Sequence, residues 1–347
     1  MRRFGFTSTE LERAKTEYIR GMEIAFNERD KTNSSVFTSE YVRHALTGEA
    51  IPGIELEYAI VRERVPGINV EEINQLVSEL VTPANQVISI SGPESEAQPL
   101  PTRDMVEEVF RSVLDEDLVA YEDEVGDEPL LPTPPVPGQI VREYVDHSVD
   151  VTHMELSNGI ELVLKPTDFK NDQVLVRATS PGGNSLAEDS QYLSALFASQ
   201  LIGSSGVGTF GPVELEKKLA GKAVSIGPTL GVLSEGFSGS ASPQDVETLF
   251  QLLYLYGTQP RADSVVYASY MSRMSSFLST MGASPQAAFG DTLSTTLSQY
   301  HYRARPLSVE LLEEVDLSDS FDFFSDRFSD FSDFTFYIVG AFDIETM

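Results

Sequence analysis

A hairpin signature at residues 151–164, VTHMELSNGIELVL, decides the fold of the larger part of this sequence. Two β-rich runs, 151–156 and 160–164, flank Asn158-Gly159, and this dipeptide is a strong signal for a tight hairpin turn. Farther along, the residue patterns predict strands at 173–179, 223–227, 231–240 and 334–339, and helices at 188–202, 212–220, 242–256, 263–281, 284–299, 308–314 and 320–329. This order indicates an α+β domain with an antiparallel sheet packed by helices.

The region before this domain is mainly helical. Thr7-Ser8-Thr9-Glu10 fits a capping box, in which a hydroxyl occupies the N-cap and a carboxylate follows three residues later. Apolar spacing predicts helices at 8–30, 35–47, 55–65, 70–81 and 102–114, and a short strand at 87–91. That strand needs pairing partners that the segment does not contain, so residues 1–100 are predicted to be the end of a larger α+β domain.

A linker is predicted between the two regions. Residues 115–128 contain eight acidic side chains, and residues 129–138 contain five prolines. Proline-rich segments are extended and semi-rigid, so we expect a linker at 101–138 between domains at 1–100 and 139–347. The acidic run lacks the spacing and central glycine of an EF-hand, which favours a solvated linker over a calcium site. Because the chain begins inside one architectural unit and ends directly after a strand, we expect it to be truncated at both ends.

Composition limits the classes of function. The 347 residues carry 54 acidic and 24 basic side chains, a net charge of −30. Such a charge disfavours nucleic acid and anionic membranes and would favour basic peptides or cations, but a saline habitat or a general need for solubility is the preferred explanation. The chain has no cysteine, which excludes disulfides and thiolate chemistry. It also has no apolar run of the ~20 residues needed to span a bilayer, and its first residues do not form a signal peptide.

Several stretches resemble the insulinase/pitrilysin family of zinc metallopeptidases. From residue 139 onward the order of elements is similar to that of the family's peptidase-like domain. The stretches that carry the similarity are Leu219–Lys222, Glu235–Pro243 followed by Asp245–Tyr256, Tyr300–Leu307 and Phe334–Asp343. Residues 5–90 similarly resemble the end of the preceding domain in that family.

The resemblance implies an enzyme built from two homologous halves that close around an extended peptide. In the family, the first half carries an H-x-x-E-H helix, whose two histidines and a more distant glutamate hold the zinc. The resemblance therefore places 1–100 at the end of the catalytic first half and 139–347 in the inactive second half. It implies zinc in the catalytic half of the complete enzyme, peptide substrates, and the catalytic half or an active subunit as the partner.

This chain lacks the zinc motif. Its four histidines are His44, His147, His153 and His301, and none has a second histidine at the motif's spacing. The helix that resembles the metal-bearing one, at 191–202, contains neither histidine nor an acid. We therefore assign no catalytic, cofactor-binding or metal-binding residue. A metal shared by His147 and His153 is disfavoured against exposed or capping histidines, and His44 and His301 are interpreted as helix-end or surface residues.

Three other motifs are better explained by a structural role than by catalysis or ligand binding. Gly206–Gly211 satisfies G-x-G-x-x-G but follows a predicted helix instead of a strand, so a flexible loop is preferred to a dinucleotide site. Ser204-Ser205 has no histidine nearby in sequence and no nucleophile elbow. The Ser-Asp-Phe pieces at 318–334 place phenylalanines 321, 324, 328 and 331 on one helical face, which predicts core packing.

The hypothesis for function is a non-catalytic segment of an insulinase-like zinc metalloendopeptidase that forms hinge and chamber wall and is inactive alone. The main alternative is a catalytically inactive scaffold or partner subunit that binds peptides or an active peptidase. A third alternative, an independent enzyme with another metal site, predicts stoichiometric zinc in the purified chain. By family analogy we expect a periplasmic or extracellular location.

Overall fold

The computed structural model describes residues 3–80, 86–92, 99–123, 128–281 and 284–345, with Thr82, Gly126 and Met347. It divides into two compact units. The smaller unit is Met1–Lys15 with Glu63–Glu124, and the larger unit is Thr16–Arg62 with Val125–Met347. The domain limits expected from the sequence remain a prediction; the observed division places residues 16–62 with the sheet.

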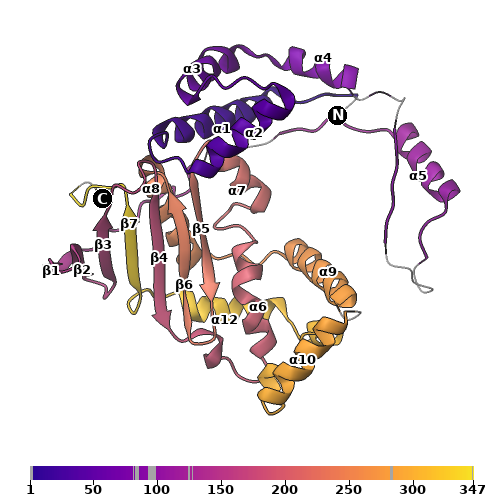
Figure 1. Ribbon diagram of the computed structural model, residues 1–347. Coiled ribbons are helices and arrows are strands. Elements are labelled where there is room, and N and C mark those ends of the chain that lie inside the picture. Colours follow the sequence, from indigo (N-terminus) through magenta and orange to yellow (C-terminus); the bar gives the residue numbers. More distant parts are fainter. Residues whose placement is uncertain are drawn as a thin grey trace. The chain divides into compact units, whose positions relative to one another are not determined.

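Helices form the first third of the described chain (Figure 1). They are α1 (Ser8–Asn27), α2 (Ser34–Thr47), α3 (Ile54–Arg64), the 3-10 turn η1 (Val65–Gly67), α4 (Val70–Leu80) and α5 (Arg103–Asp115). The capping box at α1 is confirmed, because Thr7 N donates to Glu10 Oε2 at 2.7 Å and Glu10 N donates to Thr7 Oγ1 at 3.2 Å. Asn69 and Glu72 form the same reciprocal pair at α4, with both bonds at 3.0 Å.

The strand predicted at 87–91 is wrong. These residues belong to no strand, and Val87 is 91% exposed. A strand is stable only when its backbone groups pair with another strand, and β-rich composition does not supply that partner.

A seven-stranded mixed sheet, mostly antiparallel, forms the centre of the larger unit and establishes the α+β fold. The strands are β1 (Ile140–Asp146), β2 (Val151–Leu156), β3 (Glu161–Pro166), β4 (Val174–Pro181), β5 (Val224–Leu230), β6 (Ser234–Ala241) and β7 (Thr335–Gly340). Their spatial order is β1-β2-β3-β7-β4-β6-β5. Neighbouring strands are antiparallel except β3 and β7, which are parallel.

The hairpin predicted from Asn158-Gly159 is confirmed. β2 and β3 are antiparallel, Gly159 has φ +93°, and its N–H donates to Leu156 O at 2.9 Å. Strand β1 was missed by the sequence analysis. Six of its seven residues are exposed, so it lacks the alternation of apolar and polar residues that identifies a half-buried strand.

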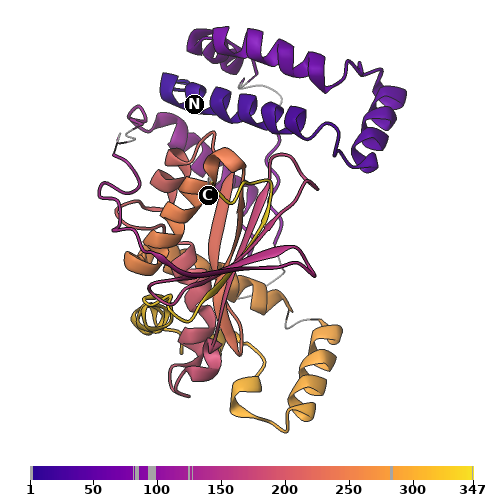
Figure 2. The same cartoon turned by 90° about the vertical axis from the view of Figure 1, so that its left-hand side faces the viewer.

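Helices cover one face of the sheet (Figure 2). α6 (Tyr192–Gly203), α8 (Val246–Thr258) and α12 (Leu317–Phe328) pack with the inward side chains of β4, β6 and β7 in a single core. On the other side of the sheet, which we call the open face, Leu175 is 48% exposed and Tyr337 is 42% exposed, and Arg177 is exposed between them. The sheet is therefore packed on one face and accessible on the other.

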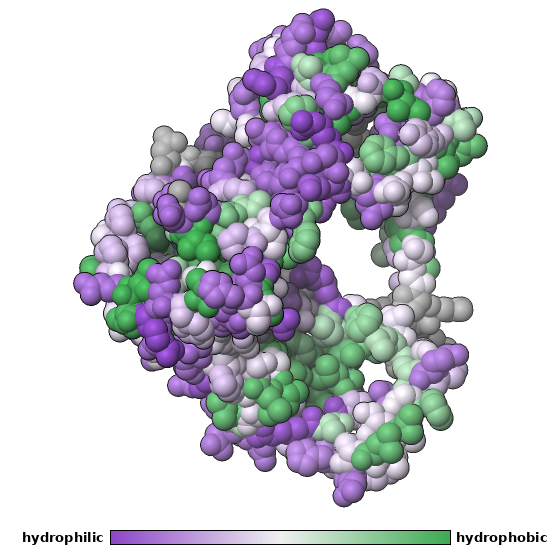
Figure 3. All heavy atoms as spheres, turned by 60° about the vertical axis from the view of Figure 1, so that its left-hand side comes forward, coloured by the Kyte–Doolittle hydropathy of each residue, from purple (hydrophilic) through white to green (hydrophobic). Residues whose placement is uncertain are grey.

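The larger unit contains further helical segments besides those packed on the sheet. They are α7 (Pro212–Lys218), α9 (Ser264–Met281), α10 (Pro285–Leu297) and the short α11 (Val309–Leu312), with 3-10 turns η2 (Gly183–Leu186), η3 (Pro243–Asp245) and η4 (Tyr302–Ala304). None of the helices in the described part of the chain combines the length and apolar character that spanning a membrane requires. On the face in Figure 3, hydrophilic residues cover much of the surface and are interrupted by smaller hydrophobic areas.

The predicted core packing of the phenylalanines is confirmed, because Phe324 and Phe328 belong to the core and Phe321 and Phe331 are partly buried against it. Phe324 and Phe328 are fully buried, and their rings stack at 4.4 Å. Phe331 lies beyond the end of α12, and its ring meets Phe237 edge-on at 5.6 Å. The Ser-Asp-Phe pieces therefore serve core packing across the helix and the turn that follows it.

Gly221 gives a first prediction, because its backbone and its surroundings both require glycine. Its φ is +78°, and an added Cβ would lie 2.2 Å from Thr16 Cγ2. We expect Gly221→Ala to lower the free energy of unfolding by about 1–3 kcal/mol or more through backbone strain and the clash. Gly290→Ala is the control, since it meets only open space in α10 and should stabilise by about 0.5–1 kcal/mol. Urea unfolding midpoints measure both, and equal shifts of the same sign would contradict the argument.

Candidate functional site

The helix expected to occupy the position of the metal-bearing helix is a packed core element. α6 buries seven side chains and packs extensively on α12. Its Ser194 Oγ accepts a hydrogen bond from Asp316 N at 2.9 Å, and Ser194 O accepts from Ser320 Oγ at 2.9 Å. Zinc in proteins is held by histidine, cysteine or carboxylate groups, and α6 has none of them. The donor set at this position does not fit zinc.

Three of the four histidines make local contacts, and the fourth lies in a turn. The ring of His153 stacks on Tyr144 at 4.7 Å, and His147 lies in the turn between β1 and β2. His44, in the last turn of α2, donates through Nδ1 to Glu49 O at 2.6 Å. His301 Nδ1 accepts from the backbone N–H of residue 303 at 3.2 Å. Within the described ranges, no group of three or more histidine, aspartate or glutamate side chains is arranged to hold a metal ion.

The glycine loop at 206–211 is anchored, which corrects the expectation of a flexible loop. Val207 is fully buried, and Gly208 N donates to Gln259 O at 2.9 Å. Arg261 donates to the carbonyls of Ser205 and Gly208, both at 3.3 Å. The loop follows α6 instead of a strand, which is not the context in which the G-x-G-x-x-G pattern binds a dinucleotide.

Arg303 holds the segment that leads into α6. Its Nε and Nη2 donate to Asp189 Oδ1 at 2.8 and 2.6 Å, and Nη2 also donates to Ala187 O at 2.7 Å. The hydroxyl of Tyr302 donates to Asp189 O at 3.1 Å. One of the family-like stretches, Tyr300–Leu307, therefore fixes the entry to the helix.

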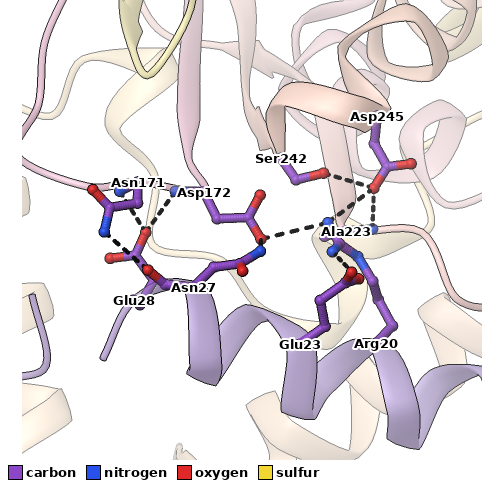
Figure 4. Close-up of polar contacts among 9 residues, drawn as sticks. All are labelled: Arg20, Glu23, Asn27, Glu28, Asn171, Asp172, Ala223, Ser242 and Asp245. Carbon is purple, nitrogen blue, oxygen red and sulfur yellow. Dashed lines mark hydrogen bonds and ion pairs between the residues drawn. The ribbon is translucent and has the colours of Figure 1, made fainter. Parts of the chain in front are cut away.

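The C-terminal half of α1 is joined to the sheet by a network of buried charges (Figure 4). The Arg20 side chain is 7% exposed, and Nη2 lies 3.6 Å from both Asp172 Oδ2 and Asp245 Oδ2. Arg20 Nη1 donates to Glu23 Oε2 at 2.6 Å. The two aspartate side chains are only 8% and 7% exposed, so the guanidinium compensates carboxylates that have largely lost their contact with water.

Hydrogen bonds hold both aspartates in position (Figure 4). Asp245 Oδ2 accepts from Ala223 N at 2.9 Å and from Ser242 Oγ at 2.8 Å. Asp172 Oδ2 accepts from Asn27 Nδ2 at 3.2 Å. The network thus links α1 to the turn before β5 and to the turn before α8.

The end of α1 is held by a second set of bonds (Figure 4). Glu28 Oε1 accepts from the N–H groups of Asn171 and Asp172, both at 2.7 Å. Asn171 Nδ2 donates to Asn27 O at 2.9 Å, which satisfies a carbonyl at the helix C-terminus. Lys170 Nζ lies 3.3 Å from Glu28 Oε2. The loop before β4 therefore caps α1 with its backbone and its side chains.

Within the smaller unit, one carboxylate of the acidic run is not solvated. The Asp123 side chain is 2% exposed and lies 2.5 Å from Arg13 Nη1. Thr9 Oγ1 donates to Asp123 Oδ2 at 2.6 Å. The prediction of a solvated linker is therefore wrong at Asp123; residues 124, 125 and 127 of the same run lie outside the described residues.

A buried ion pair lies under the turn between β4 and α6. The Glu235 side chain on β6 is fully buried, and its Oε1 lies 2.5 Å from Arg327 Nη2 of α12. Gly183 N–H donates to the other carboxylate oxygen. Burial acts to lower the pKa of Arg327, but the hydrogen bonds and charges of Glu235 and Asp326 together outweigh it and raise that pKa above its ordinary value. The pair joins the sheet to α12.

Comparison with known proteins extends these observations. No family model matches the chain. A relative described as a zinc protease PQQL-like, from Arabidopsis thaliana, is 28% identical over 347 residues. The match covers 99% of this chain and 34% of the relative.

Two solved structures share the fold. The periplasmic protease PqqL from Escherichia coli has a TM-score of 0.57 and 19% identity, and the match covers 98% of this chain and 38% of that protein. The ferredoxin protease FusC, as a mutant in complex with Arabidopsis ferredoxin, has a TM-score of 0.56 and 17% identity, with 99% and 38% covered. This chain is therefore homologous to part of a PqqL-like zinc protease and spans about a third of that relative's length.

Proposed function

We propose that this chain is a non-catalytic segment of an M16 zinc metalloendopeptidase and forms part of its hinge and chamber wall. In this proposal, 1–100 closes the catalytic first half and 139–347 opens the inactive second half. One observation carries it: the chain matches a zinc protease over 99% of its length, yet α6, at the expected position of the metal helix, offers no zinc ligand. Zinc and the general base would come from the catalytic half of the complete protein.

The sheet supports a role as a wall. Its helices lie on one side, and Leu175, Arg177 and Tyr337 on the open face remain accessible. An open sheet face can contact a bound chain through many side chains while the packed face keeps the fold rigid. The charge network at Arg20 holds the C-terminal half of α1 against this scaffold.

The test compares the 347-residue chain with a longer polypeptide that includes the catalytic half. We expect the isolated chain to contain no stoichiometric zinc and to leave peptides intact. The longer protein should contain one zinc and should cleave peptides until a chelator is added. Chelator-sensitive cleavage by the isolated chain, with one tightly bound zinc, would overturn the proposal.

An inactive scaffold or partner subunit is the second candidate, and the packed α6 favours it equally, because a scaffold needs no ligand there. The gene distinguishes the two. A reading frame that encodes H-x-x-E-H upstream of residue 1 supports the segment, whereas a separate active peptidase that co-purifies with the chain supports the scaffold.

We also propose a periplasmic or extracellular location for the complete protein. The support is the similarity to a protease from Escherichia coli that is described as periplasmic. Fractionation of cells that express the full-length protein tests this, and recovery of the protein only from the cytoplasm would contradict it.

The charge of the chain leads to a prediction about substrates. A net charge of −30 attracts basic peptides and increases their rate of association. We expect the complete enzyme to cleave a lysine- or arginine-rich peptide about tenfold or more faster than an acidic peptide of equal length at low salt. The preference should shrink at ~1 M salt, where the Debye length falls to about 3 Å. Equal rates at low salt would contradict the prediction.

A further inference from the structure

A hollow of about 550 Å³ lies at one end of the sheet. It is built where the β2–β3 turn, the end of β4, the start of β6 and the segment before β7 meet. Glu161, Thr335 and Thr179 are paired across β3, β7 and β4, so their side chains form a row. The adjacent Ala178 and Phe336 are 2% and 3% exposed in the helix-covered core, which places this row on the open face.

The charged side chains that line the hollow are all acidic. Two carboxylates, Glu161 and Asp333, line it, and none of its described lining residues is basic. Ser180, which is 1% exposed, donates its hydroxyl hydrogen to Asp333 Oδ2 at 2.8 Å and fixes that carboxylate. Thr335 Oγ1 donates to Glu161 Oε2 at 3.4 Å. Each carboxylate can accept several hydrogen bonds, so these contacts leave acceptor capacity for a ligand.

The walls also suit an aliphatic stem. Leu233 and Pro181, which are both exposed, contribute apolar surface beside the hydroxyl groups. Arginine and lysine side chains combine an apolar stem with a cationic end that donates hydrogen bonds, and a guanidinium matches carboxylates with paired donors. Glu161 and Asp333 are both exposed to water, so a neutral group gains no ion pair from them and an anionic group is repelled.

We propose that this hollow binds the guanidinium or ammonium end of an arginine or lysine side chain of a peptide lying along the open face. The peptide as the source of the cation rests on the proposed function, whereas the binding chemistry is a property of this chain alone. The site would select basic residues at one position of the bound peptide, in addition to the diffuse attraction of the net charge.

The experiment uses the intact chain and a matched pair of probes. Nα-acetyl-arginine N-methylamide is compared with its citrulline counterpart, which has the same shape and no charge, by ligand-detected saturation-transfer NMR titration. We expect saturable binding of the arginine probe and at least tenfold weaker binding of the citrulline probe, which corresponds to about 1.4 kcal/mol. Equal binding of the two probes would overturn the proposal.

Variants locate the site. Glu161→Gln with Asp333→Asn should weaken binding of the arginine probe about tenfold, whereas Glu143→Gln on the exposed β1 strand should change it less than twofold. Circular dichroism establishes that the double variant is folded, and Asp333→Asn alone keeps an oxygen that can accept from Ser180. Unchanged binding by the folded double variant would overturn the assignment. So would complete displacement of the arginine probe by stoichiometric Ca²⁺, which would assign the hollow to a metal ion.

These results are separable from the proposed function. Binding of the probe requires neither zinc nor cleavage. The probe can therefore fail to bind the hollow while the complete protein still contains zinc and cleaves peptides. Equally, the probe can bind while the complete protein shows no zinc-dependent cleavage.

Discussion

Replacing Arg20 with methionine is expected to lower the free energy of unfolding of the larger unit by about 3–5 kcal/mol. Methionine keeps much of the side-chain length but leaves Asp172 buried without its cation, while Asp245 keeps only Lys222 Nζ at 3.9 Å. Breaking a buried pair in this way costs more than the pair contributes, because a charge out of contact with water is left uncompensated. Urea unfolding followed by circular dichroism measures the change.

Hydrogen exchange identifies which part of the fold the substitution releases. If the substitution frees only the C-terminal half of α1, protection should be lost at residues 16–27 before the sheet is affected. Adding Asp172→Asn to Arg20→Met should recover part of the loss, since a neutral amide is less costly to bury than a carboxylate.

Arg43→Met in α2 is the matched control. Its ion pair with Glu49 spans 3.0 Å, but the two side chains are 54% and 48% exposed. Exposed pairs contribute about 0–1 kcal/mol, so this variant should unfold close to the parent. Equal effects at Arg20 and Arg43, or no change in exchange at α1, would show that the buried network does not hold the helix.

Local chemistry made much of the fold predictable. The Asn158-Gly159 turn fixes a hairpin through residues adjacent in sequence, and the capping pair at Thr7 and Glu10 marks a helix start within four residues. Strand β1 could not be predicted from the sequence, because it is exposed on both faces and its apolar and polar residues do not alternate. The segment 87–91 was misassigned because its β-rich composition was not matched by a pairing partner.

The polar contacts that organise the molecule could not be predicted in the same way. Arg20 meets Asp172, Glu235 meets Arg327, and Arg13 meets Asp123, and each pair joins segments far apart in the chain. No sequence periodicity or motif predicts such an ion pair, because its formation depends on how the helices and strands pack together. The absent zinc motif was different, since four histidines at unsuitable spacings can be judged from the sequence alone.

The second large effect is expected at the ion pair beneath the β4–α6 turn. Arg327→Met should lower the free energy of unfolding by about 3–5 kcal/mol, whereas Glu235→Gln should lower it by about 1–3 kcal/mol. The asymmetry follows from burial, since the Glu235 side chain is fully buried and the Arg327 side chain is 19% exposed. Without its partner, Arg327 can reach water, but the carboxylate of Glu235 cannot.

A double-mutant cycle separates this explanation from simple loss of packing. The Glu235→Gln, Arg327→Met double variant should be more stable than Arg327→Met alone, because the buried group is then neutral and its amide oxygen still accepts from Gly183 N–H. Arg142→Met is the control, since its pair with Glu155 is 62% and 38% exposed and should contribute about 0–1 kcal/mol. If Glu235→Gln destabilises more than Arg327→Met, the uncompensated carboxylate is not the dominant cost, and packing of α12 on the sheet must account for the loss.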